Sequence, residues 1–130
     1  LHDTQHVHHL RAVEWFAGHA ELGWASCPLT QNGCLRIMSQ AAYSNPQPMN
    51  LLVQMLQNST AAPWHALWSD DISLLDGHLF RHTHIHSSKQ LTDLYLLGLV
   101  VRNQGCLVTF DQRIPLSAVH GATPEHLVVL

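Results

Sequence analysis

The sequence that decides the fold runs from Leu91-Thr92-Asp93 into an apolar run that reaches Val101, and then, after a short turn, through Leu107-Val108-Thr109-Phe110-Asp111. Asp93 is the one acid of the first stretch, and Asp111 ends the second. A carboxylate in such apolar surroundings is costly unless a cation or hydrogen bonds compensate it. An acid on a helix and an acid at the C-terminal end of a strand can meet where open α/β sheets bind ligands. The pattern therefore predicts an oxygen-ligand site for Mg²⁺ or Mn²⁺.

Length and composition favour one compact domain over residues 1–130. Hydrophobic residues make up 46% of the chain, which is enough for a sizeable core. Charged residues make up only 12%, with a net charge of −3. A broad nucleic-acid-binding stripe is therefore not visible, and any RNA contact must depend on a local basic patch or on a metal ion.

The cysteines and the hydropathy indicate the compartment. Cys27, Cys34 and Cys106 are odd in number and lack CxxC spacing, so we interpret them as reduced thiols of a cytoplasmic protein. No apolar run approaches the roughly 20 residues that cross a bilayer, so no membrane partner is expected.

Helical and strand-like patterns alternate along the chain. We expect helices at residues 7–20, 30–39, 49–56, about 72–80 and 90–103, and strands at residues 23–27, 64–68, 107–110 and 127–130. Thr30 is the expected N-cap of the second helix, and Gly105 is the expected left-handed residue after the last. The alternation predicts an α/β fold with a parallel sheet covered on both faces.

Four blocks, in order, resemble one known family. They are His6-Val7-His8-His9, Trp24-Ala25-Ser26-Cys27-Pro28-Leu29-Thr30-Gln31-Asn32-Gly33 with Leu35-Arg36-Ile37, Gln90-Leu91-Thr92-Asp93-Leu94-Tyr95-Leu96-Leu97, and Leu107-Val108-Thr109-Phe110-Asp111. Together they resemble the PIN domain, and within it the VapC-type ribonuclease toxins of bacterial toxin–antitoxin pairs. The resemblance implies a three-layer α/β/α sandwich with a central parallel sheet. It also implies a homodimeric, metal-dependent endoribonuclease that acts on RNA and is inhibited by a cognate antitoxin.

The resemblance assigns Asp93 and Asp111 as catalytic metal ligands. Gln31 stands where the family has a glutamate, and an amide oxygen brings one negative charge fewer to the ion. The first acid of the family lies on an apolar strand that precedes the region matching residues 2–9, so this strand is expected to be missing. We therefore expect an impaired nuclease, with a catalytically silent PIN-like binding module or a decayed toxin copy as the alternative.

Simpler roles remain open for both acids. Asp93 could be an acid in the first turn of a helix, where the helix dipole favours negative charge. Asp111 could be a turn residue that follows a strand.

Several cationic and aromatic residues could contact RNA. Arginines match phosphate bidentately, which makes Arg36, Arg113 and Arg102 the candidates, although each could be a surface residue or an ion-pair partner. The four tryptophans could stack on bases, but their positions favour a core role; they are Trp15, Trp24, Trp64 and Trp68.

The histidines form a second conspicuous pattern. His78, His82, His84 and His86 could bind Zn²⁺ or Ni²⁺ if a loop gathered them, but a solvated polar loop is the favoured interpretation. Near the N-terminus, capping of the first helix is favoured over contacts to RNA phosphate for His6, His8 and His9.

Overall fold

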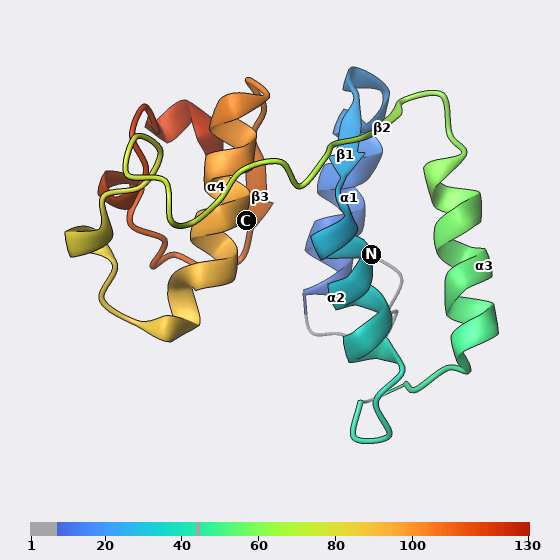
Figure 1. The fold of residues 1–130 in the computed structure, drawn as a ribbon. Helices are drawn as coiled ribbons and strands as arrows, with labels where there is room; N and C mark the ends of the chain where they lie inside the picture. Colours follow the sequence, from blue (N-terminus) through green and yellow to red (C-terminus); the bar gives the residue numbers. More distant parts are fainter. Residues whose placement is uncertain (1–7, 44) are drawn as a thin grey trace. The chain divides into compact units, whose positions relative to one another are not determined.

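The computed structural model describes residues 8–43 and 45–130, and it divides the chain into two compact units, Leu1–Asp70 and Asp71–Leu130 (Figure 1). Each unit is a mixture of helices and short strands. Predictions that fall on residues 1–7, including a helix start at Val7 and the role of His6, lie outside the described residues.

The first unit contains three helices and one parallel pair of strands among its described residues. In chain order these elements are α1 (His9–His19), η1 (Ala20–Leu22), β1 (Trp24–Ser26), α2 (Pro28–Met38), α3 (Met49–Thr60) and β2 (His65–Leu67). Strand β1 pairs in parallel with β2, with Trp24 opposite His65 and Ser26 opposite Leu67. The helices and strands agree with the predicted order, although α3 is longer than expected and both strands are shorter.

The start of α2 is fixed by side chains from two places in the sequence. Cys27, rather than Thr30, is the N-cap residue; Thr30 lies three positions into the helix, and its Oγ1 accepts a hydrogen bond of 3.0 Å from the Cys27 N–H. The predicted start was therefore too late, because Pro28 already has the backbone angle that the first helical position requires. Asp70 accepts a further hydrogen bond of 2.9 Å from the free Leu29 N–H.

The second unit is built around one helix and a second parallel pair. Its elements are η2 (His82–His84), η3 (Ser88–Gln90), α4 (Leu91–Arg102), β3 (Leu107–Thr109), η4 (Leu116–Ala118), η5 (Pro124–His126) and β4 (Leu127–Val129). Strand β3 pairs in parallel with β4, and α4 contacts β3 (Figure 1). Leu94 and Leu97 of α4 are completely buried in a core that also holds Phe80 and Ile114.

Two details of this unit differ from the prediction. Residues 72–80 form turns rather than a helix, because Ser73 and Asp76 bond the N–H groups of Leu75 and His78 and so compete with helical hydrogen bonds. At the end of α4 the left-handed residue is Gln104, with φ of 56°, and not Gly105. Gly105 instead donates its N–H to Val100, which completes a Schellman motif.

The α/β class and the parallel pairing are confirmed. The four strands of the described residues form two separate two-stranded sheets, each within its own unit, rather than one central sheet. Over residues 8–43 and 45–130, each helix is too short or too polar to cross a membrane.

Gly98 of α4 packs directly against Phe80, and this contact leads to a test of the core. A Cβ atom at position 98 would lie 2.7 Å from Cζ of Phe80, which is 1% exposed. We expect Gly98→Ala to lower the free energy of unfolding by about 1–3 kcal/mol, because the buried ring has to shift. Gly33→Ala in α2 is the matched control: it meets no atom within 4 Å and should stabilise the protein by about 0.5–1 kcal/mol. Urea unfolding measures the free energy of unfolding of both variants. Equal changes in Gly98→Ala and Gly33→Ala would contradict this description of the core.

Candidate active site

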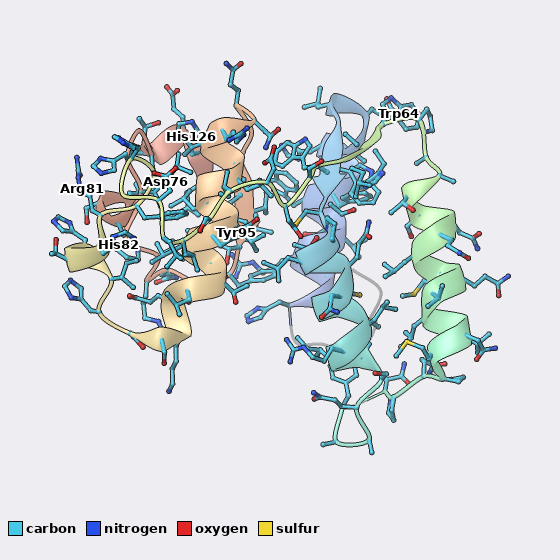
Figure 2. The ribbon with its side chains drawn as sticks, viewed as in Figure 1. Trp64, Asp76, Arg81, His82, Tyr95 and His126 are labelled. Carbon is cyan, nitrogen blue, oxygen red and sulfur yellow. The ribbon has the colours of Figure 1, made fainter. Side chains whose placement is uncertain are left out.

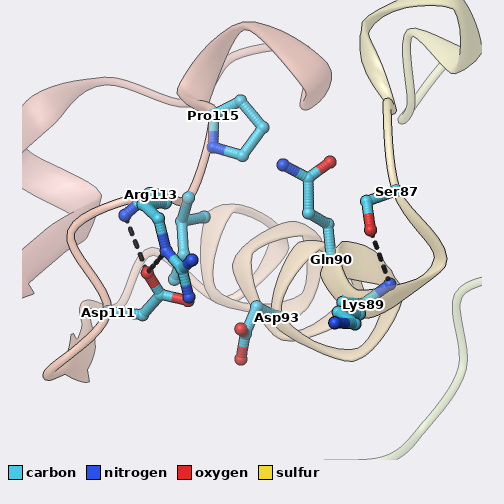
Figure 3. Close-up of a pocket in the computed structure, with 8 residues that line it drawn as sticks. Ser87, Lys89, Gln90, Asp93, Asp111, Arg113 and Pro115 are labelled. Atoms are coloured by element: carbon cyan, nitrogen blue, oxygen red, sulfur yellow. Dashed lines mark hydrogen bonds and ion pairs between the residues drawn. The ribbon is translucent and has the colours of Figure 1, made fainter.

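Asp93 and Asp111 line the same pocket in the second unit. The pocket has a volume of about 140 Å³, and its walls come from the segment before α4, from the first turn of α4 and from the loop after β3 (Figure 3). It is lined by Ser87, Lys89, Gln90, Asp93, Asp111, Arg113, Ile114 and Pro115. The structure thus brings together the two acids that the sequence singled out.

Asp93 lies in the first turn of α4 and is partly buried. The neighbouring Leu94 and Leu97 face the core, and this fixes the side of the helix on which Asp93 emerges. Within the described part of the chain, no residue donates a hydrogen bond to its carboxylate. Burial raises the pKa of Asp93, and the negative charge of Asp111 raises it further.

Asp111 follows β3 and is held in a tight turn by Arg113. Its Oδ1 accepts hydrogen bonds from the Arg113 backbone N–H at 2.8 Å and from Arg113 Nε at 3.3 Å, while its own N–H donates to Thr109. These bonds from Arg113 lower the pKa of Asp111 below its ordinary value. Asp111 is therefore ionised at neutral pH, and its Oδ2 atom has no recorded partner in the described chain.

The local geometry agrees with the simpler roles as well as with the predicted ones. Asp93 lies in the first turn of a helix and Asp111 lies in a turn after a strand, which are the two simpler roles considered for them. Neither role explains why the two carboxylates share a pocket in which they repel each other. A hard divalent cation would offset that repulsion, and carboxylate oxygens are its preferred ligands. The pair fits such an ion as part of its coordination shell. Within residues 8–43 and 45–130, no group of three or more His, Cys, Asp or Glu side chains is arranged to hold a metal ion.

Gln31, the third predicted ligand, lies in the first turn of α2 in the first unit. Its Nε2 donates to Ser26 Oγ at 2.9 Å, and Ser26 Oγ in turn lies 2.8 Å from His65 Nε2. The His65 ring also packs on Trp24, with ring centroids 4.4 Å apart. Because the amide nitrogen of Gln31 is used in this way, its Oε1 is the atom that remains available for a ligand.

The candidate RNA-binding arginines have different surroundings. Arg113 lies at the pocket, with its side chain 89% exposed. Arg36 is exposed in the last turn of α2, in the first unit. Arg102 forms an ion pair with Asp71 at 3.4 Å, as its alternative interpretation stated.

The histidine and tryptophan predictions can be compared with the same structure. His78, His82, His84 and His86 are all exposed; His82 is bonded to the Leu74 carbonyl and lies at the surface (Figure 2). The core role is wrong for Trp64, which is 46% exposed in the turn before β2 (Figure 2). The other three tryptophans are partly buried.

Sequence reasoning missed two groups of residues. Lys89 was interpreted only as part of a polar segment, and Ser87 only as a candidate cap of the helix that carries Asp93, although both line the pocket. Ser26 and His65 were read only as strand residues. Their shared face follows from the parallel register of β1 and β2, which a single sequence does not specify.

Comparison with known proteins places the chain in a family. It is 45% identical over its full length to Ribonuclease VapC44 of Mycobacterium tuberculosis and covers 92% of that protein. It is 34% identical over 96% of its length to Ribonuclease VapC38 and 32% identical over 89% to Ribonuclease VapC39 of the same organism, covering 88% and 84% of those proteins. No family model and no solved structure matches.

The fold and the paired acids define an α/β protein with a candidate oxygen-ligand metal site. The similarity is more specific, and the chain belongs to the VapC ribonuclease family. The resemblance found in the sequence is therefore confirmed.

The electrostatic coupling of the two acids can be measured directly. In Asp111→Asn, we expect the pKa of Asp93 to fall but to stay above its ordinary value, because burial remains as the larger cause. The folded protein holds the Asp93 proton more tightly than the unfolded protein does. The free energy of unfolding therefore falls as pH rises from the ordinary pKa through the raised pKa of Asp93. Asp111→Asn should make this fall smaller. Carboxyl ¹³C NMR titration is the measurement, with Glu125→Gln as the control. An unchanged pKa of Asp93 in Asp111→Asn would show that the acids do not interact.

Proposed function

We propose that this protein is a metal-dependent endoribonuclease toxin that hydrolyses phosphodiester bonds of RNA. The observation that carries the proposal is that Asp93 and Asp111 share one pocket in a chain closely similar to proteins named as VapC ribonucleases. The proposed cofactor is Mg²⁺ or Mn²⁺, because the available donors are carboxylate oxygens.

Asp93 and Asp111 are the proposed ligands. When bound, a divalent cation polarises the phosphate and makes water a better nucleophile at neutral pH. Asp111 presents its free Oδ2, since Arg113 occupies Oδ1. Asp93 presents a carboxylate that no described residue bonds. Arg113 and Arg36 are the proposed contacts to RNA phosphates.

The finer features of the family are also proposed for this chain. They are a single domain with the PIN-type three-layer sandwich, a homodimer, a cognate antitoxin as partner and a cytoplasmic location. The parallel pairing within each unit and the family membership support the sandwich. The free cysteines suit a reducing compartment.

We propose that catalysis is weak and that Gln31 is one cause. As a third ligand it would supply a neutral oxygen in place of a charged one, and the affinity of a hard-cation site depends on the charge of its ligands. The Ser26 hydroxyl accepts a hydrogen bond from the Gln31 amide nitrogen, which leaves Oε1 as the atom for the ion.

A charge restored at position 31 should strengthen the ion site. We expect Gln31→Glu to raise Mn²⁺ affinity by roughly tenfold, equivalent to about 1.4 kcal/mol, and to increase RNA cleavage, whereas Asp93→Asn should abolish both. Asn32→Asp is the matched control, since it adds the same charge at the next, exposed position. Calorimetric titration with Mn²⁺ and a cleavage assay with and without EDTA are the measurements.

The same experiment separates the enzyme from the silent binding module. Cleavage that survives Asp93→Asn or EDTA would overturn the proposed mechanism. A folded Gln31→Glu protein that neither binds Mn²⁺ nor cuts RNA would favour the silent module instead.

A further inference from the structure

Lys89 is the only lysine of the chain, and it lies at the candidate active site. It belongs to η3, the short turn that leads into α4, and its backbone N–H donates to Ser87 Oγ at 3.2 Å. That bond fixes the backbone from which the side chain extends. In the described part of the chain, its ammonium group has no ion pair or hydrogen bond.

Arg113 is the second cation of the pocket, and its guanidinium group is only partly used. Nε and the backbone N–H both bond Asp111 Oδ1, which holds the group in place. No bond to a described residue is recorded for the two terminal nitrogens, and these are the donors that form a bidentate pair with phosphate. In Figure 3, Arg113 and Lys89 lie on opposite sides of Asp93.

The size of the pocket limits what it can hold. Its volume of about 140 Å³ is well below the roughly 300–1,000 Å³ of pockets that enclose small organic ligands. A phosphate group with its water fits this space, whereas an enclosed nucleoside does not. The ionic and polar walls also suit the backbone of a nucleic acid better than its bases, since backbone contacts position a strand without reading its sequence.

The charges of the pocket point to the same ligand. Two carboxylates alone would repel a phosphodiester, and the two cations of the pocket balance them. Only six lysines and arginines occur in the whole chain, so two of them at one pocket is a notable share of its positive charge.

We propose that Lys89 and Arg113 form a phosphate clamp, which binds the backbone of single-stranded RNA across the pocket without selecting a base. This rests on the proposed function in one respect, that the ligand is RNA. It adds Lys89 as a substrate-binding residue and assigns base preference to surfaces outside this pocket.

The test measures binding alone and is independent of the metal. Asp93→Asn serves as the background, in EDTA, because this protein should not cleave RNA and carries one acid fewer to repel it. The affinity for a short fluorescein-labelled single-stranded RNA is measured by anisotropy between roughly 50 and 200 mM salt. Lys89→Gln, Arg113→Gln and the double variant are compared in this background, and circular dichroism checks that each is folded.

Each lost phosphate contact should reduce the slope of log affinity against log salt by about 0.7. We expect the slope to fall by about 0.7 in each single variant and by about 1.4 in the double variant. The loss of affinity should be equal for RNAs of different sequence. Arg81→Gln is the matched control, because Arg81 is an exposed cation of the same unit outside the pocket, and its slope should not change.

Three results would overturn the clamp: no RNA binding by the background protein, slopes unaffected by Lys89→Gln and Arg113→Gln, or an equal loss in Arg81→Gln. A loss confined to one RNA sequence would overturn the absence of base selection. Failure of the proposed function would be seen in a different experiment, in which a protein with Asp93 intact neither binds Mn²⁺ nor cleaves RNA. The two failures are therefore distinguishable.

Discussion

Asp93 and Asp111 share one pocket, where burial and the neighbouring charge both disfavour the ionised form of Asp93. The packing of α4 in the core fixes the position of Asp93, and the turn after β3 fixes that of Asp111, so neither acid can move away without disturbing regular structure. The protein handles the two charges differently. Arg113 stabilises the ionised form of Asp111, whereas burial and the charge of Asp111 disfavour the ionised form of Asp93. A bound cation would offset the unfavourable interaction between the two carboxylates. Ionisable groups with shifted pKa values are concentrated at functional sites.

In the first unit, the polar residues around Gln31 are hydrogen-bonded to one another. Gln31, Ser26 and His65 satisfy one another through short hydrogen bonds, and Asp70 bonds a free N–H at the start of α2. In this network Gln31 uses its amide nitrogen, and the amide oxygen is left for a ligand. The resemblance implies a metal-binding glutamate at this position, and the role of Gln31 as a third ligand is a proposal.

Much of this could be predicted from the sequence, and the failures have physical causes. The apolar run after Asp93 correctly indicated a buried helix, and the short apolar stretch before Asp111 correctly indicated a strand. The helix expected at residues 72–80 failed because Ser73 and Asp76 bond nearby backbone groups. Gly105 was preferred as the left-handed residue on intrinsic grounds, yet the Schellman motif places Gln104 there. Lys89 and His65 depend on tertiary neighbours that periodicity cannot supply. Whether the acids bind a metal ion is a property of the folded site, which local patterns only suggest.

The central claim is that the pocket between Asp93 and Asp111 is where a divalent cation binds. Paramagnetic broadening of backbone amide resonances by substoichiometric Mn²⁺ tests it most directly, because the effect falls steeply with distance from the ion. Broadening should centre on the amides of Asp93 and Asp111 and should disappear in Asp93→Asn. Broadening centred instead on the exposed histidines from His78 to His86, or unaffected by Asp93→Asn, would contradict it.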